Sequence, residues 1–459
     1  MSNASVYDVV IIGAGPAGIK SVLSLQELGL KIALIDEAST LGGQIYKNVE
    51  KNAKHKELFK EEYLKGLDFI KKVNFENIDY IHDASVWSIS SKQEIYYSKE
   101  NTSYKIEAKK IIIATGSMER PCPVKGWTLP GVMGATAAQI ILKESSIIKD
   151  DAVFVGTGPL FYYVIAQYLD AGAKIKAIID TTPIANYLKA FKYLPKALLD
   201  MGPLLKGLSF FIKFKKHDVK IYNFIDDISF EGNEELEKVV FTNGSKKVSI
   251  DTNIAFVHNG LAPNINLQLQ AGCEYEFSKV TRTINITTDE YMQSSVDNIF
   301  VVGDGKSIRG VDVAIVEAKI ASLKVAESFH KIPNDSFSSE FKMYLKELNS
   351  YMYLRDFLDT LYLPSTKLLL PSGDDVVVCR CEEVTLKDIK DSLEIDCRGP
   401  NSIKSFTRCG MGSCQARFCG LTLLEIISRE TKVPIDELKY LRIRSPIKPV
   451  RIEEMGRLA

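Results

Sequence analysis

The chain has 459 residues, enough for about three domains of ordinary size, and 46% of them are hydrophobic and 25% charged. This composition is typical of a globular protein and argues against a disordered, collagen-like or disulfide-dense secreted chain. Lysine plus arginine and aspartate plus glutamate number 58 each, so no net charge attracts nucleic acid, and we predict no nucleic-acid partner.

The sequence also argues against a membrane span or an export signal. The first ten residues lack a basic region followed by an apolar one. The apolar stretch at residues 205–214 is interrupted by Lys206 and Lys213, and no run approaches the ~18 uncharged residues that a span requires. We therefore predict a cytoplasmic protein without an integral membrane span. In that compartment its eight cysteines are ligands or core residues rather than disulfides.

A glycine loop follows the first predicted strand. Residues 6–12 are apolar, residues 13–18 read Gly-Ala-Gly-Pro-Ala-Gly, and a helical pattern leads to a second strand at residues 31–35. In such a unit the first glycine permits the tight turn, the second lets the backbone approach a pyrophosphate, and the third lets helix pack on strand. An acidic residue at the end of the second strand would accept from a ribose hydroxyl. The predicted dinucleotide-binding residues are Gly13, Gly15, Pro16, Ala17, Gly18 and Asp36, with Glu37 as the adjacent alternative acceptor.

Later motifs favour a flavin over a nicotinamide in this first site. A loop without bulky side chains, Gly42-Gly43-Gln44, would let an isoalloxazine ring lie along it. Two further buried strands end in small residues, one at Thr115-Gly116 and one at Gly303-Asp304. These two strand ends, together with the glycine loop at residues 13–18, resemble the two-dinucleotide-domain flavoproteins, a resemblance that implies FAD with Asp304 at its ribityl chain.

A second strand–loop–helix–strand unit begins at residue 152. Its loop carries Gly156 and Gly158, and its second strand ends at Asp180, but Phe161 occupies the third glycine position. Close packing of helix on strand must therefore differ from that in the first unit. The pattern leaves two interpretations open, a bound NAD(P) or a different or absent nucleotide.

Residues 184–225 are rich in lysine, with intermittent leucine and phenylalanine. Two arrangements fit this pattern, an amphipathic helix on a membrane surface and a solvated insertion packed by its apolar stripe. The insertion is the commoner arrangement. Peripheral membrane association therefore stays the alternative.

The final part of the chain carries two close pairs of cysteines. A predicted helix at residues 337–363 and a Pro/Gly break precede it, and Thr385 with Asp388 forms a capping box for a helix. Further helices are predicted at residues 401–406 and from residue 422. The pairs are Cys-x-Cys and, after 27 intervening residues, Cys-x4-Cys, and the predicted metal ligands are Cys379, Cys381, Cys409 and Cys414.

Four thiolates can hold zinc or an iron–sulfur cluster, and their spacing alone does not choose between them. The tight Cys-x-Cys pair and the second loop, with Gly410 and Gly412, resemble the bacterioferritin-associated-ferredoxin type of [2Fe-2S] domain, which we prefer. Cys419 is the reserve ligand and Cys397 a bystander. Nearby arginines would offset the negative charge of a cluster, namely Arg380, Arg408 and Arg417.

Nearly the whole chain resembles one family. The matching segments are residues 13–18, 42–46, 126–132, 156–160, 303–304 and 444–449, and the two cysteine pairs. They are similar to the FAD and iron–sulfur subunit shared by opine oxidases (the A subunit), hydrogen cyanide synthase (the B subunit) and heteromeric dye-linked proline or hydroxyproline dehydrogenases, related to the α subunit of sarcosine oxidase. Lys47 and Lys125 depart from the family pattern, which leaves the substrate open.

The resemblance implies an α/β fold with two Rossmann-like domains and a small helical [2Fe-2S] domain. The expected domains are residues 1–120 with 281–330 for FAD, 121–280 for a second nucleotide-like unit, 331–372 as a helical connector, and 373–459 as the cluster domain with its tail.

The resemblance also implies an oxidoreductase that works in a complex. The expected partners are a flavoprotein subunit that oxidises the amine and a small ferredoxin-like subunit, with a small-molecule amine as the substrate. The chain itself would relay electrons, and no residue is assigned as catalytic. Two alternatives are a stand-alone NAD(P)H:acceptor reductase, which would need nicotinamide in the second unit, and a non-catalytic scaffold subunit.

Overall fold

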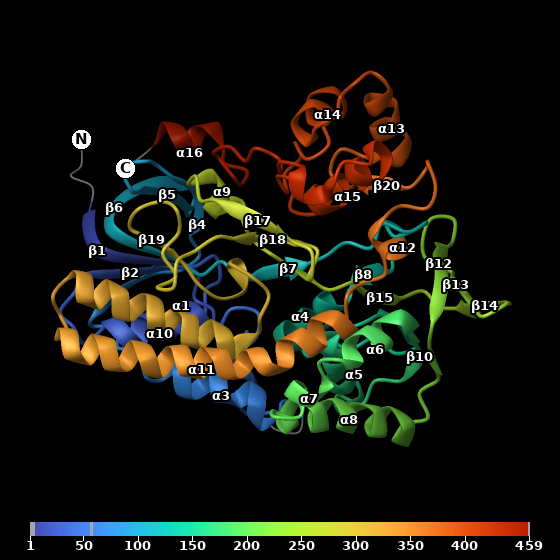
Figure 1. Cartoon of the computed structure of the whole chain (residues 1–459), viewed down its shortest axis with the longest axis horizontal. Coiled ribbons are helices and arrows are strands. Elements are labelled where there is room, and N and C mark those ends of the chain that lie inside the picture. Colours follow the sequence, from blue (N-terminus) through green and yellow to red (C-terminus); the bar gives the residue numbers. More distant parts are fainter. Residues whose placement is uncertain (1–4, 56–57, 458–459) are drawn as a thin grey trace.

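The computed structural model describes residues 5–55 and 58–457 and contains a mixed sheet, a parallel sheet, their helices and a small C-terminal domain (Figure 1). Residues 1–4 lie outside the described residues. They belong to the N-terminal segment for which the sequence predicts no export signal. In the described part no helix is long and apolar enough to cross a membrane.

The first sheet has the strand order β3-β2-β1-β6-β5-β4, and β19 pairs with the end of β6. Its strands are β1 (Ser5–Ile12), β2 (Ile32–Ile35), β3 (Ile78–Ile81), β4 (Ser85–Ile89), β5 (Glu94–Lys99), β6 (Thr102–Ile113) and β19 (Ile299–Val301). The first, second, third, sixth and nineteenth strands are parallel, so their carboxyl ends meet at one edge. The helices of this part are α1 (Pro16–Leu25), α2 (Val49–Asn52), α3 (Glu61–Ile70), α10 (Val311–Ser328) and α11 (Asn334–Leu361).

The second sheet is parallel throughout, with the order β11-β10-β9-β15-β8. Its strands are β8 (Val132–Gly134), β9 (Ala152–Gly156), β10 (Ile175–Asp180), β11 (Ile221–Tyr222) and β15 (Ala255–His258), and its helices are α4 (Ala135–Ser145), α5 (Pro159–Asp170), α6 (Ile184–Phe191), α7 (Leu194–Ala197) and α8 (Met201–Lys216). A separate antiparallel sheet consists of β12 (Ile225–Glu231), β13 (Lys238–Asn243) and β14 (Lys246–Asp251).

Short elements join the sheets. They are β7 (Ser117–Glu119) paired with β16 (Leu261–Pro263), α9 (Asn266–Gln270), the hairpin of β17 (Tyr275–Ser278) and β18 (Thr283–Ile286), and the 3-10 helix η1 (Gly303–Gly305). The expected domain boundary between residues 280 and 281 divides the β17–β18 hairpin.

The C-terminal domain is small and mostly helical. It contains α12 (Thr366–Leu369), β20 (Val377–Cys379), β21 (Val384–Thr385), α13 (Leu386–Glu394), α14 (Pro400–Thr407), α15 (Cys419–Thr431), the 3-10 helix η2 (Ile435–Glu437) and α16 (Ile452–Gly456). The predicted capping box of Thr385 and Asp388 is confirmed at the start of α13. The helix predicted from residue 422 begins three residues earlier, at Cys419.

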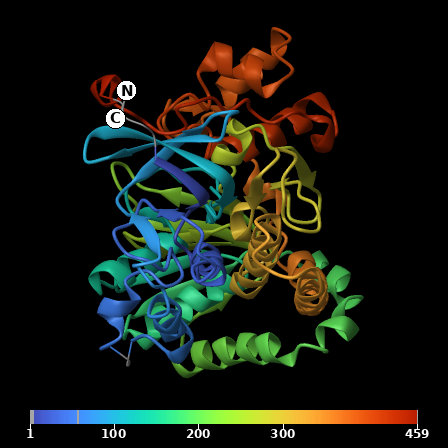
Figure 2. The same cartoon turned by 90° about the vertical axis from the view of Figure 1, so that its left-hand side faces the viewer.

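The C-terminal domain shares a core with one face of the first sheet. Ile111 and Ile113 of that sheet belong to the same buried cluster as Leu424 and Ile427 of α15. A polar contact also ties this domain to the turn between β17 and β18, where Arg282 pairs with Glu425 at 2.9 Å. In both views this domain lies at one end of the molecule and α8 at the opposite end (Figures 1 and 2).

Candidate functional site

A cleft of about 480 Å³ opens at the carboxyl edge of the first sheet, where the loops after β1, β2, β6 and β19 meet. Most of the predicted dinucleotide-binding residues line it. They are Gly13, Gly15, Pro16, Ala17, Asp36, Glu37, Gly43, Gln44, Thr115, Gly116, Gly303 and Asp304. The structure therefore brings four loops that are distant in sequence to one site.

Other predicted glycines allow close packing of the backbone around the loop after β1. A Cβ on Gly18 would lie 1.7 Å from the carbonyl oxygen of Gly13, so only glycine lets α1 pack this closely on the loop after β1. Gly42 has a φ of +119°, a conformation that side chains disfavour. Gly43 has a φ of +56°, and a Cβ there would lie 2.7 Å from the Cα of Gly15. These close backbone approaches form the floor of the cleft.

The two acidic residues after β2 have different environments. Asp36 accepts hydrogen bonds from the backbone N–H groups of Ala14 and Ala38, so its carboxylate ties the glycine loop to the second strand. Burial raises the pKa of Asp36, and the two N–H donors oppose that rise. Glu37 is 54% exposed, accepts from the Ser85 hydroxyl at 3.2 Å and pairs with Lys448. Glu37 is therefore the more accessible acceptor for a ribose.

Asp304 lies just before the N-terminus of α10. Its Oδ1 accepts from the N–H groups of Arg309 at 3.0 Å and Gly310 at 3.1 Å, and burial raises its pKa. The preceding Gly303 donates its N–H to Glu317 at 2.8 Å, and Glu317 forms a buried ion pair with Lys306 at 2.6 Å. These interactions hold the loop after β19 against the cleft.

The C-terminal domain completes the cleft, a contribution that the sequence analysis missed. Arg417, Ile447 and Lys448 line its wall beside the glycine loop. Arg417 donates from Nη1 to the carbonyl oxygens of Cys414 at 3.1 Å and Ile447 at 3.0 Å. The sequence assigned Arg417 only to the charge near the cysteines, because nothing in the local pattern shows which distant loop it reaches.

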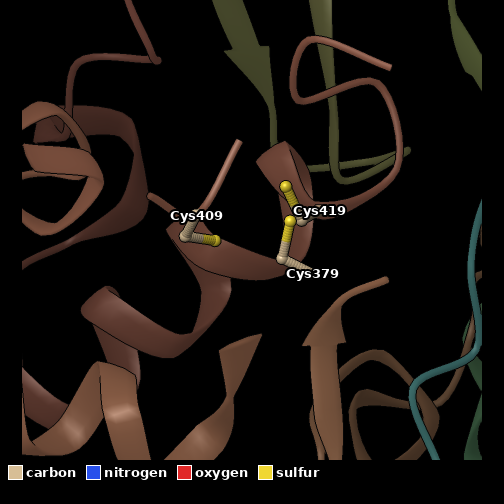
Figure 3. A group of neighbouring side chains, drawn as sticks. All are labelled: Cys379, Cys409 and Cys419. Carbon is tan, nitrogen blue, oxygen red and sulfur yellow. The ribbon is translucent and has the colours of Figure 1, made fainter. Parts of the chain in front are cut away.

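The cysteines form a buried group next to this wall. The sulfur atoms of Cys379, Cys409 and Cys419 lie within 4.8 Å of one another, and all three residues are buried (Figure 3). Cys379 ends β20, Cys409 follows α14 and Cys419 begins α15. Cys419, the reserve ligand of the sequence analysis, thus lies with two of the four predicted ligands.

The other two predicted ligands form a second pair at the rim. Cys381 is exposed, Cys414 is half-buried, and their side chains are hydrogen-bonded to each other. A Cβ on Gly412 would lie 2.2 Å from the Cβ of Cys381, so a glycine is required where the two cysteine loops cross. Five thiols are therefore available for a group that needs four.

Hydrogen bonds make Cys379 the most acidic thiol of the group. Donation from the thiols of Cys409 and Cys419, with two backbone N–H groups, lowers the pKa of Cys379 to about 2. The same interactions raise the pKa of Cys409 and Cys419. Thiolates in a buried cluster are ligands that iron and zinc both accept, so this donor set fits a metal centre.

The three nearby arginines differ in position. Arg408 is paired with Glu382 at 2.7 Å, which balances its charge, and Arg380 is exposed. Arg417 is half-buried, and burial lowers its pKa. Arg417 is thus the arginine that faces both the cleft and the cysteine loop.

In the second Rossmann-like unit, residues predicted for a second nucleotide site make contacts within the chain itself. Asp180 is buried and accepts from the Tyr162 hydroxyl at 2.7 Å and the Thr182 N–H at 2.8 Å. A Cβ on Gly156 would lie 2.1 Å from the carbonyl oxygen of His258, so this glycine has a packing role. Phe161, at the third glycine position, is fully buried. The carboxylate that would bind a ribose is already engaged within the chain.

Comparisons with known proteins agree with this architecture. A family model described as pyridine nucleotide-disulphide oxidoreductase matches residues 7–200 and 209–318, and a sarcosine oxidase A3 domain model matches residues 376–457. The A subunit of opine oxidase from Agrobacterium tumefaciens (strain Ach5) is 33% identical over 463 residues, covering 98% of this chain and 92% of that protein.

The chain belongs to the pyridine nucleotide-disulphide oxidoreductase family, together with the A subunits of opine oxidases. Hydrogen cyanide synthase subunit HcnB of Pseudomonas protegens is 26% identical, covering 96% of both chains. The crystal structure of L-proline dehydrogenase from P. horikoshii has a TM-score of 0.75 at 23% identity and covers all of this chain and 81% of that one.

Family membership confirms the resemblance stated from the sequence and the predicted α/β fold with two Rossmann-like units. This flavoprotein oxidoreductase has relatives that are named as subunits of opine oxidase, hydrogen cyanide synthase and sarcosine oxidase. The family supports FAD as a cofactor, and the buried thiols could hold a metal.

Lys143 gives a first testable consequence for the cleft of this flavoprotein. It lies on α4, is buried, and donates from Nζ to the carbonyl oxygens of Gln44 at 2.9 Å and Ile45 at 2.8 Å. Burial lowers its pKa from 10.5 to about 7. Lys143→Met should lower the free energy of unfolding by about 1–3 kcal/mol, because two carbonyl groups lose their donor.

The pH dependence of this difference has a defined sign. Between pH 7 and 10.5 the unfolded chain binds more protons at Lys143 than the folded chain, so native stability rises with pH there. The gap between native protein and Lys143→Met, measured by urea unfolding, should therefore widen as the pH rises. Lys51→Met is the matched control, an exposed lysine that also bonds a carbonyl. Parallel pH profiles for native protein and Lys143→Met would contradict this interpretation.

Gly412 gives a second prediction, for the cysteine loops. Gly412→Ala should separate these loops, because its methyl group would overlap Cys381. We expect metal content to fall by more than about half while the flavin remains, measured by elemental analysis and visible absorbance. Gly399→Ala, in the same domain but with only ordinary contacts, is the control. Full metal content in Gly412→Ala would refute the prediction.

Proposed function

We propose that this chain is the electron-transferring subunit of a complex that oxidises a secondary amine, such as an opine, proline or a glycine-like compound. Its relatives are named as the A subunit of opine oxidase and subunit HcnB of hydrogen cyanide synthase, and a structural neighbour is an L-proline dehydrogenase. The proposed partners are a flavoprotein subunit that oxidises the amine and a small ferredoxin-like subunit. The protein is proposed to act in the cytoplasm.

The cleft of the first sheet is the proposed FAD site. Bound FAD would accept a hydride or electrons one at a time, chemistry that no side chain supplies. The N-terminus of α1 offers backbone N–H groups to a pyrophosphate, and those of Gly15 and Ala17 lie at the cleft. Glu37 is the proposed ribose acceptor, and Asp304 is proposed to lie at the ribityl chain. The small residues Thr115 and Gly116 leave room above the floor formed by Gly43.

The cysteine group is the proposed site of a [2Fe-2S] cluster, which would supply one-electron transfer. The proposed ligands are Cys379, Cys381, Cys409 and Cys414. Cys419 is proposed to remain a thiol that donates a hydrogen bond to Cys379. Zinc is the competing occupant, because it also accepts four sulfur ligands.

The main support for the proposed function is the wall shared by the proposed FAD cleft and the cysteine group. Arg417 lines the cleft and bonds the carbonyl oxygen of Cys414, so a single side chain contacts both sites. Electron transfer requires two redox centres at short range, and this arrangement supports that requirement. A nicotinamide-dependent reductase is less well supported, because Asp180 is engaged with Tyr162 and Thr182.

Anaerobic purification with analysis of flavin, iron, sulfide and zinc tests this function. We expect about one FAD and about two iron atoms per chain, with a paramagnetic signal after reduction. Cys414→Ser should lose iron and Cys419→Ser should retain it. NADH alone should leave the flavin absorbance unchanged. A zinc-loaded chain without iron would overturn the proposal, and the opposite result for the two serine variants would place Cys419 among the ligands.

A separate prediction concerns the shared wall. Arg417→Met should weaken FAD binding roughly tenfold, because a charge-assisted donor to the cleft is lost. Titration of the apoprotein with FAD, followed by quenching of flavin fluorescence, measures this change. Arg417→Lys should recover part of the affinity, and Lys439→Met, exposed in the same domain, is the control. An unchanged affinity in Arg417→Met would remove the arginine from the FAD site.

A further inference from the structure

Helix α8 presents an apolar stripe to solvent. Met201, Leu205, Leu208 and Ile212 follow a helical spacing of four, three and four residues and are each 45% to 62% exposed. Residues with this spacing share one face of a helix. A surface helix ordinarily turns such a face toward the core, so the orientation of α8 is reversed.

The opposite face of α8 holds the helix to the body of the protein. Phe214 is fully buried, and its ring lies 6.5 Å from that of Tyr162 on α5. Lys206 pairs with Glu62, and Lys213 pairs with Asp170 at 2.6 Å. The exposed stripe is therefore not needed for folding of the described chain and remains available for another surface.

Helix α6 repeats the arrangement. Ile184, Leu188 and Phe191, spaced by four and three residues, are 63% to 79% exposed. Leu198 and Leu199, beyond α7, are exposed as well. We use the name α6–α8 surface for the exposed apolar side chains of residues 184–216, which lie on α6, on α8 and on the segment between them.

The positive charge of the α6–α8 surface indicates the kind of partner that it binds. Residues 184–216 contain seven lysines and one acidic residue, Asp200. Lys206 and Lys213 are paired with Glu62 and Asp170, which leaves five lysines and a net charge of +4 in a chain whose total charge is zero. Lys215 and Lys216 continue the exposed face at the end of α8. Lysine is depleted in the cores of protein–protein interfaces, whereas exposed leucine and phenylalanine flanked by lysine are typical of helices that lie in the lipid headgroup region.

We propose that the α6–α8 surface binds the surface of a bilayer that contains anionic phospholipid. The apolar side chains of α6 and α8 would enter the headgroup region, and exposed lysines such as Lys215 and Lys216 would face the phosphate groups. The C-terminal domain lies at the opposite end from α8, so the cysteine loops stay away from the lipid (Figures 1 and 2). This proposal is independent of the proposed electron-transferring function.

Vesicle flotation of the full chain tests the proposal. Extruded vesicles of phosphatidylcholine alone and with one third phosphatidylglycerol are the probes. We expect binding to the anionic vesicles that is at least roughly tenfold stronger than to the neutral ones and that weakens with salt. The double variant Leu205→Glu/Ile212→Glu should lose binding by a factor on the order of ten or more, and Lys215→Glu/Lys216→Glu should do the same on anionic vesicles.

The controls separate lipid binding from folding and from protein contacts. Ile452→Glu, an 89% exposed residue outside the surface, should bind vesicles like the native chain. Both double variants should keep the native midpoint of thermal unfolding and the native flavin absorbance. Absence of binding to anionic vesicles would overturn the proposal. So would a native dimer, or a complex with another protein, that Leu205→Glu/Ile212→Glu dissociates, because the surface would then be a protein interface.

Discussion

The docking of the C-terminal domain on the first sheet is the contact on which the rest of the site depends. Ile111 and Ile113 of the sheet and Leu424 and Ile427 of α15 form one buried core, so the domain is held in place by apolar burial. Arg417 then reaches the cleft and contacts the carbonyl oxygen of Cys414. Without this docking the cleft would lose a wall, and the cysteines would have no fixed relation to it.

Close backbone contacts at glycines form the floor of the cleft, opposite the wall that the C-terminal domain supplies. Gly18 on Gly13 and Gly43 on Gly15 approach more closely than any side chain allows, and this leaves a smooth floor next to the N-terminus of α1. The same constraint acts at the cysteine loops, where Gly412 lies against Cys381. Both the cleft and the cysteine loops therefore depend on glycines that let two chain segments approach closely. The chemistry would come from the groups that these loops hold.

The second Rossmann-like unit shows how a repeated motif can keep its geometry with different interactions. Gly156 is required by the carbonyl group of His258, and Asp180 is satisfied by Tyr162 and Thr182. Buried polar groups that already have partners gain little from an added ligand. The helices that extend from this unit, α6 and α8, turn their apolar residues outward instead.

Local features of this chain follow from the order of its residues alone. The glycine loop, the buried strands that precede Thr115 and Gly303, and the capping box of Thr385 and Asp388 could be predicted, because turns, caps and strand periodicity depend on neighbouring residues. The four loops of the cleft could be assigned to one site from their motifs. The fold class followed from the same patterns and from the family resemblance.

Which distant groups meet depends on how the helices and strands pack against one another. Cys419 lies with Cys379 and Cys409 because α15 begins at that residue and packs on β20, which cysteine spacing does not encode. The position of Arg417 in the cleft and the contact of Lys143 with the 44–45 carbonyls depend on how separate elements dock. The orientation of the apolar stripe of α8 could not be predicted from the sequence either. A helical period shows that an apolar face exists, but it does not show whether that face points to the core or to solvent.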